Sequence, residues 1–313
     1  MPKALKYILY TAAFIGSYIL FVYWMFPMEA VKGRIITSLE TTLGSGYGVH
    51  IGDITTHWLS GVRLKNILIN QTSQGKEENI WKIDQATARV GLFSLVFGSP
   101  KISFDGKMGK TRLGGTLRNS DQGFSADCSF SNLDISQIQA AKQMTGLNLT
   151  SSIDGEIQVN YDAKQPLRTV GKMDIAFDKL NLKGGEIPLG EMGSFPLPDL
   201  SIANGGSTLK ALIDKGAINL ENFKLKGDDL NIELSGKVFL SPQISKYRMN
   251  LQGKFQLSPK LWTTLDPILP AKWLEELKKQ KGADDNLPLS VSGQLSSPQI
   301  YSGTVAIFPF KPF

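Results

Sequence analysis

Cysteine and histidine are scarce in this chain of 313 residues, and their scarcity narrows the kinds of site that it can hold. The single cysteine, Cys128, excludes an intramolecular disulfide, so strand pairing and packing alone must stabilise an exported domain. Only His50 and His57 stand beside it as nitrogen ligands, and a zinc site would need carboxylates to complete it. They flank a predicted strand over Val49–Thr56, and residues seven apart in a regular strand point to opposite faces. We therefore predict no metal site and no cofactor.

Strong charge and catalytic signatures are also missing. The chain has 34 Lys and Arg against 28 Asp and Glu, and the basic residues are scattered rather than gathered in the dense cluster that nucleic-acid binding needs. We find no nucleophile elbow, phosphate loop, pair of zinc ligands on a helix or framed pair of carboxylates. We expect a folded protein that is not an enzyme and does not bind nucleic acid.

One long run of uncharged residues lies near the N-terminus. Tyr7–Phe26 comprises twenty residues, about the length that crosses 30 Å of hydrocarbon as a helix. Lys3 and Lys6 precede the run, which predicts a cytoplasmic N-terminus and places the rest of the chain across the membrane. A cleaved signal peptide is the alternative, but its apolar core is usually shorter and its cleavage site has more small residues than this flank. The predicted anchor residues are Tyr7, Tyr10, Phe14, Leu20, Trp24 and Phe26.

A second helix is predicted directly after the span. Apolar residues recur at helical spacing from Glu29 to Leu43, and a glycine-rich turn follows at Gly44–Gly46. The expected organisation is a cytoplasmic tip and transmembrane anchor over residues 1–28, an amphipathic helix over 29–46 and a β-rich domain over 47–313.

Beyond this helix the hydrophobic period changes from that of a helix to two. Apolar and polar residues alternate over Lys101–Met108, Ile153–Asp162 and Leu230–Leu240, and again in later segments. Such alternation is typical of antiparallel strands with one apolar and one solvated face, and not of parallel strands buried on both faces. Apolar positions that share this phase, and could line a groove, are Phe104, Ile157, Ile232, Leu234 and Leu251.

A short quasi-repeat runs through these strands, with a glycine in phase with the apolar residues. It contains Gly106, Gly236, Gly253 and Gly293. Glycine weakens a strand, so its repeated use predicts a sheet that bends or that is closely approached on its apolar face. We expect an extended, coiled antiparallel sheet with a few short helices; bulges at the corners of a β-sandwich are the alternative.

Little helix is available to cover this sheet. The clearest later helical pattern runs from Ser258 to Lys281, is interrupted by two prolines and ends in a basic stretch. It can cap one end of the sheet or lie against a membrane surface, and we favour capping.

The order of these elements resembles a known family. The short basic start and single span are followed by Phe26–Lys32, which opens the amphipathic helix, and then by Gly48–Ile51 and Trp58–Leu64. In this pattern the chain is similar to the longer form of general secretion pathway protein N, a component of type II secretion systems. That form is similar in turn to the AsmA-like proteins, whose anchored β-sheets coil into an open groove lined for lipid.

This resemblance implies a Gram-negative inner-membrane protein with a single span and most of the chain in the periplasm. It implies an accessory role in type II secretion, with other secretion components as partners. The alternative is an AsmA-like groove that binds or transfers phospholipid, because a row of apolar side chains without a covering helix must be buried by something. The family defines no site motif that could be carried over to residues of this chain.

Overall fold

The computed structural model describes residues 3–25, 28–43, 46–57, 60–73, 76–91, 100–120, 123–137, 148–162, 164–188, 194–241, 246–267, 271–282 and 284–309. The chain forms two compact units, Met1–Val90 and Gly91–Phe313. Antiparallel strands make up most of the described residues of the chain, so the predicted fold class, mainly β with few short helices, is confirmed.

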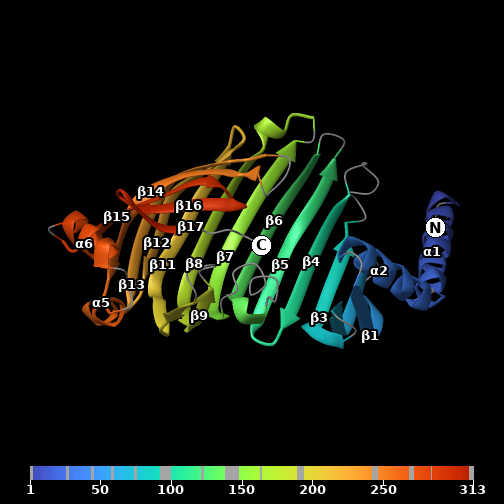
Figure 1. The fold of residues 1–313 in the computed structure, drawn as a ribbon. Coiled ribbons are helices and arrows are strands. Elements are labelled where there is room, and N and C mark those ends of the chain that lie inside the picture. Colours follow the sequence, from blue (N-terminus) through green and yellow to red (C-terminus); the bar gives the residue numbers. More distant parts are fainter. Residues whose placement is uncertain are drawn as a thin grey trace. The chain divides into compact units, whose positions relative to one another are not determined.

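The first unit holds two helices and three strands (Figure 1). They are α1 (Lys3–Trp24), α2 (Met28–Leu43), β1 (Tyr47–His57), β2 (Gly61–Ser73) and β3 (Lys76–Val90). The strands pair in chain order, with Ile51 of β1 opposite Ile67 of β2, and Ile67 opposite Ile83 of β3. This register places the apolar residues of the three strands on one face.

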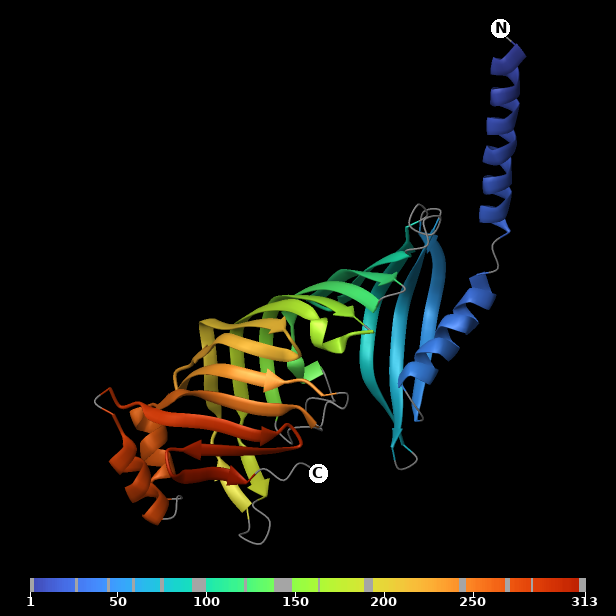
Figure 2. The same cartoon turned by 90° about the horizontal axis from the view of Figure 1, so that it is seen from above.

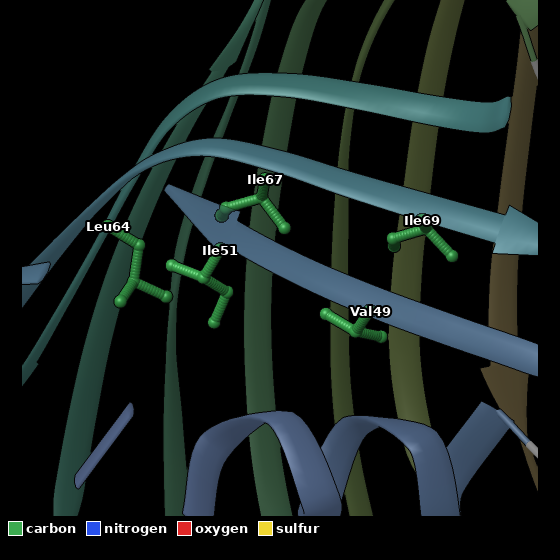
Figure 3. Packing of buried hydrophobic residues seen from close by; sticks show 5 residues of the cluster. All are labelled: Val49, Ile51, Leu64, Ile67 and Ile69. Atoms are coloured by element: carbon green, nitrogen blue, oxygen red, sulfur yellow. The ribbon is translucent and has the colours of Figure 1, made fainter. Parts of the chain in front are cut away.

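Helix α2 packs on this apolar side of β1–β3. Figure 3 shows Val49 and Ile51 of β1 with side chains of β2 on the side of the strands that faces the helix, where Ile35 and Leu39 of α2 pack against them. Two polar contacts fix the helix on β1: Lys32 Nζ donates to the Gly52 carbonyl at 2.9 Å, and the Val49 N–H donates to Glu40 Oε1 at 3.0 Å. The predicted amphipathic helix is confirmed.

Helix α1 covers most of the predicted span. The helix runs from Lys3 to Trp24, and Tyr7, Tyr10 and Phe14 are exposed, with at least 66% of each residue's surface accessible. Leu20 and Trp24 lie in the helix but their side chains are outside the described part, as is the whole of Phe26.

Across the part of the chain that the structure describes, no helix has both the length and the apolar character that crossing a membrane requires.

The second unit is built on twelve strands that form one sheet. Their bounds are β4 (Lys101–Met108), β5 (Thr111–Ser120), β6 (Gly123–Leu133), β7 (Asn148–Asp162), β8 (Val170–Lys183), β11 (Leu200–Asp214), β12 (Ala217–Lys226), β13 (Leu230–Phe239), β14 (Arg248–Leu257), β15 (Leu287–Gln294), β16 (Ser297–Ser302) and β17 (Val305–Pro309). Each strand pairs antiparallel with the strand before it in this list. A separate hairpin, β9 (Gly185–Pro188) with β10 (Ser194–Leu197), lies between β8 and β11 in sequence.

The sheet of this unit is a single curled layer. Figure 2 shows the strands β15–β17, in red, turned out of the plane of the green strands β5–β7. Positive φ angles at Gly236 (139°) and Gly293 (95°) put two glycines of the quasi-repeat in backbone conformations that other residues rarely adopt. The predicted open, coiled sheet is confirmed, and the β-sandwich is wrong, because the described strands form no second layer over the first.

Four short helices accompany the sheet in the described part of this unit. Two are 3₁₀ turns, η1 (Ile135–Gln137) and η2 (Pro166–Arg168), and two are α-helices, α5 (Pro259–Leu265) and α6 (Ala271–Gln280). Ser258 caps the N-terminus of α5, since its hydroxyl accepts the Leu261 N–H at 3.1 Å. The predicted helical region over Ser258–Lys281 is thus two helices, and its capping position on the sheet follows from the contacts described below.

Candidate functional site

The apolar residues of the second unit form continuous rows across the sheet. Residues that face each other across an antiparallel pair point to the same side, so the register defines each row. The central row starts at Phe104 of β4 and continues from strand to strand with apolar residues or glycine only. Its members are Phe104, Gly115, Cys128, Ile157, Met173, Ala211, Leu220, Gly236, Leu251, Val291 and Ile300.

Two further rows flank the central one on the same side of the sheet. Each again contains only apolar residues, glycine or proline, and together the three rows define what we name the apolar face. The first flanking row is Ile102, Leu117, Ala126, Val159, Gly171, Ile213, Ile218, Val238, Met249, Gly293 and Pro298. The second is Gly106, Leu113, Phe130, Gly155, Ile175, Leu209, Phe223, Leu234, Gly253 and Leu289.

The opposite side of the sheet, the polar face, has the reverse composition. The row beside the central one reads Ser103, Thr116, Asp127, Gln158, Lys172, Leu212, Asn219, Lys237, Asn250, Ser292 and Gln299, with one apolar residue. On β12–β14 opposite charges lie side by side. Glu233 of β13 forms a salt bridge with Lys224 of β12 and lies 3.3 Å from Lys254 Nζ of β14. The Lys224 hydrogen bond is the main cause that holds the pKa of Glu233 below its ordinary value. The sheet therefore has one solvated side and one apolar side.

All five predicted groove residues lie on the apolar face. Phe104, Ile157 and Leu251 belong to the central row, Leu234 belongs to a flanking row, and Ile232 lies one step further along β13 on the same side. The alternation in the sequence therefore correctly predicted that these residues of β4, β7, β13 and β14 lie on one side of the sheet. Whether they line a groove for a ligand stays a prediction.

The apolar face is only partly covered. Ile102, Leu113 and Leu117, on β4 and β5, keep 39%, 42% and 41% of their surface exposed, although they belong to an uninterrupted apolar patch. Contiguous exposed apolar surface of this kind marks an interaction site in a folded protein. An occupant of this face would remove the exposed side chains from water.

At one end the face is closed by the two short helices. Leu261 of α5 is buried against Leu182 of β8 and Leu200 of β11, which lie on the apolar side near the strand ends. Leu277 of α6 is buried against Leu287 of β15 and Val305 of β17. The capping position predicted for this region is confirmed for the described residues.

Glycines on the apolar face accommodate aromatic rings. A Cβ atom added to Gly155 would lie 2.7 Å from Phe130 Cζ, and one added to Gly115 would lie 2.8 Å from Phe104 Cζ. In each case the ring comes from the neighbouring strand and covers the glycine. Gly155 and Gly115 lie outside the quasi-repeat, and the protein's own phenylalanines approach them on the apolar side.

Sequence reasoning missed the contribution of β5 and β6. Neither strand was predicted, and with them Leu113, Cys128 and Phe130 were overlooked as members of the rows. A signal was present, because Phe124, Ala126, Cys128 and Phe130 alternate with polar residues. Burial, and to a lesser degree the charge of Asp127, raises the pKa of the Cys128 thiol, as expected for a thiol on an apolar surface.

Among the described residues of the apolar face, Cys128 is the titratable side chain of the three rows. Across the described residues, no group of three or more His, Cys, Asp or Glu lies close enough together to hold a metal ion. His57 Nδ1 lies 2.8 Å from Arg63 Nη2 and so accepts a hydrogen bond, while His50 is exposed.

Comparisons with known proteins give no match: no family model, no curated protein and no solved structure is similar to this chain.

Proposed function

We propose that this protein is a non-enzymatic, membrane-anchored protein whose apolar face binds the acyl chains of membrane lipids. The observation that carries the proposal is the set of three adjacent rows that stay apolar across the sheet of the second unit while the reverse side is polar. A sheet in a soluble core would bury such a face against a second layer. Here an apolar ligand supplies the missing cover.

The dimensions of the face suit chains rather than compact molecules. Twelve strands at the usual spacing of about 4.8 Å give rows of about 50 Å, measured along the sheet. Two opposed acyl chains fill the bilayer core of about 30 Å, so the rows offer room for more than one lipid. The exposed residues on β4 and β5 provide an open part of the face, and α5 and α6 close another part.

The anchor in this proposal is residues 7–26. Their sequence is free of charge, and the described aromatic side chains of α1 are exposed, so they too need an apolar environment. With Lys3 and Lys6 on the cytoplasmic side, the β-rich units lie across the inner membrane, in the periplasm of a Gram-negative cell.

A role in type II secretion stays a prediction from the sequence resemblance. Other secretion components would be its partners in that role. They would contact the polar face of the sheet while lipid occupied the apolar face. The two roles are therefore compatible on one chain.

The lipid proposal is tested by crosslinking in native membranes. A photo-reactive amino acid is placed at Phe104 or at Ile232, and adducts are identified by mass spectrometry. We expect phospholipid adducts at both positions, since both lie on the apolar face. Matched controls carry the same group on the polar face, at Ser103, one residue from Phe104, and at Ser235, three residues from Ile232.

Equal lipid adducts at the controls would reflect general membrane proximity and would contradict the proposal. Adducts solely within the chain at Phe104 and Ile232 would also contradict it, because the face would then be closed on itself.

A further inference from the structure

The polar face carries a local excess of positive charge on the hairpin β4–β5. Residues 101–120 contain five basic side chains and one acidic one, a net charge of +4, whereas the whole chain has a net charge of +6. The basic residues are spread over 18 positions, so the sequence shows no dense cluster. Pairing of the two strands brings them together.

The register sets like charges directly opposite each other. Lys101 of β4 faces Arg118 of β5, and at the other end of the hairpin Lys107 faces Arg112. Like charges in such positions destabilise an antiparallel pair. Opposite charges pair at other positions of the polar face, as in Lys210 with Asp174 at 3.4 Å.

One of the two like-charged pairs lies in a depression. The depression has a volume of about 480 Å³ and is lined by Lys101 and Arg118, by Lys172 of β8, and by both polar and apolar residues of β5–β8. Across the strands, Arg118 faces Ser125 of β6, which faces Asn160 of β7. Cationic groups, a hydroxyl and an amide thus follow one another at strand spacing, about 4.8 Å.

Two of the positive groups in this depression, Arg118 and Lys172, are available to an anion. Neither Arg118 nor Lys172 forms a salt bridge with any other described residue, although Asp127 lines the same depression. A concave surface with such cations concentrates positive potential. The Asp127 carboxyl oxygens can accept a hydrogen bond from a hydroxyl group beside the anion.

From this arrangement we infer that the depression binds a phosphate ester that also carries hydroxyl groups. Arg118 and Lys172 hold the phosphate oxygens, Ser125 and Asn160 donate further hydrogen bonds, and Asp127 accepts from a ligand hydroxyl. Such a ligand is either the headgroup of a phospholipid or a soluble phosphate compound, and the site is separate from the apolar face.

The test uses the full chain in an uncharged detergent and ligands without acyl chains. Glycerol 3-phosphate represents a soluble phosphate monoester, glycerophosphoglycerol represents a lipid headgroup, and glycerol is the uncharged control. Isothermal titration calorimetry at low salt measures affinity. We expect at least one phosphate compound to bind and glycerol not to bind. The phosphate compound that binds more tightly shows whether the natural ligand is a lipid headgroup or a soluble phosphate ester.

Substitutions separate the site from general charge attraction. Arg118→Gln and Lys172→Gln should each weaken binding about tenfold, because hydrogen bonds to charged groups contribute roughly that much. The matched control is Lys107→Gln with Arg112→Gln, which removes two charges from the same hairpin outside the depression and should change affinity less than twofold.

Stability serves as the second readout. Arg118→Gln removes one member of a like-charged pair, so its melting temperature should be unchanged or higher; Lys172→Gln provides an independent variant on another strand. Absence of binding by both phosphate compounds would overturn the inference. So would an equal loss in the control variant, which would indicate surface attraction only. Neither outcome depends on lipid binding by the apolar face.

Discussion

At the scale of single residues, the apolar face depends on the pairing of glycine with phenylalanine across neighbouring strands. Phe130 of β6 lies over Gly155 of β7, and Phe104 of β4 lies over Gly115 of β5. The rings occupy the space that a side chain on the glycine would need. These pairs keep the face apolar where glycine alone would expose backbone.

Adding a methyl group at one of these glycines should destabilise the protein. In Gly155→Ala the new Cβ would lie 2.7 Å from Phe130 Cζ and 3.0 Å from the Asp174 carbonyl oxygen, so ring and strand must shift. We expect a loss of about 1–3 kcal/mol in the free energy of unfolding, measured by urea titration.

The control for this substitution is Gly114→Ala on the polar face of β5. There the nearest atoms to an added Cβ are 3.6 and 3.7 Å away, an ordinary contact distance. Stability should be unchanged, or higher by about 0.4–1 kcal/mol, because alanine restricts the unfolded chain. An equal effect of the two variants would contradict the packing described for Gly155.

Single residues also mark how far sequence reasoning reached. The period of two placed Phe104, Ile157 and Leu251 in one phase, and the register then aligned them in one row. The period did not reveal that Gly115 and Cys128 complete the row, since glycine pairs such as Gly114–Gly115 lower strand propensity. The alternation within one strand shows which of its residues share a side. The register between two strands decides which residue of the neighbouring strand lies opposite, and the sequence of one strand does not contain it.

At the scale of elements, α5 and α6 are the pieces that close one end of the apolar face. Helical spacing of leucines predicted the helical region, but not the strands that it covers. Leu261 follows β14 closely in sequence, yet it packs on β8 and β11. This contact arises because the sheet curls, and curl accumulates over many strands beyond the reach of a local pattern.

Truncation of the buried leucine of α5 should loosen this closure. Leu261 is 5% exposed, so Leu261→Ala leaves a cavity and should cost about 2–5 kcal/mol in unfolding free energy. Urea titration measures the change, and the exposed neighbour Lys260→Ala should stay within about 0.5 kcal/mol of the parent. A small effect of Leu261→Ala would mean that α5 does not contribute to the folded sheet.

The hairpin β2–β3 extends through residues whose composition is typical of a loop. Gln71–Asn79 is a polar stretch, but β2 continues to Ser73 and β3 begins at Lys76. Composition favoured a loop, whereas the long antiparallel hairpin supplies backbone partners for these polar residues.

At the scale of the whole molecule, charge near residues 7–26 decides how the chain is oriented in the proposed arrangement. Lys3 and Lys6 precede the segment, while Lys32 and Arg34 follow it, so the bias is small. We expect Lys3→Glu with Lys6→Glu to reverse part of the population, because basic residues favour the cytoplasmic side. Alkaline phosphatase fused to the C-terminus reports the change, since the enzyme is active only in the periplasm.

The parent fusion should be active, and the double variant should lose part of that activity. Lys107→Glu with Lys110→Glu is the control, because these residues lie too far from the segment to affect orientation. An inactive parent fusion would contradict the proposed periplasmic location.

The order of strands in the second unit has a consequence for how the protein is made. In the described part of the chain, each strand of the main sheet from β5 to β17 pairs with the sheet strand that precedes it, and the β9–β10 hairpin lies between β8 and β11 in sequence. Contacts are therefore close in sequence, which favours rapid folding from the N-terminal side. A chain that emerges gradually from a ribosome or a translocation channel can add each strand to the growing edge as it appears, without waiting for the C-terminus.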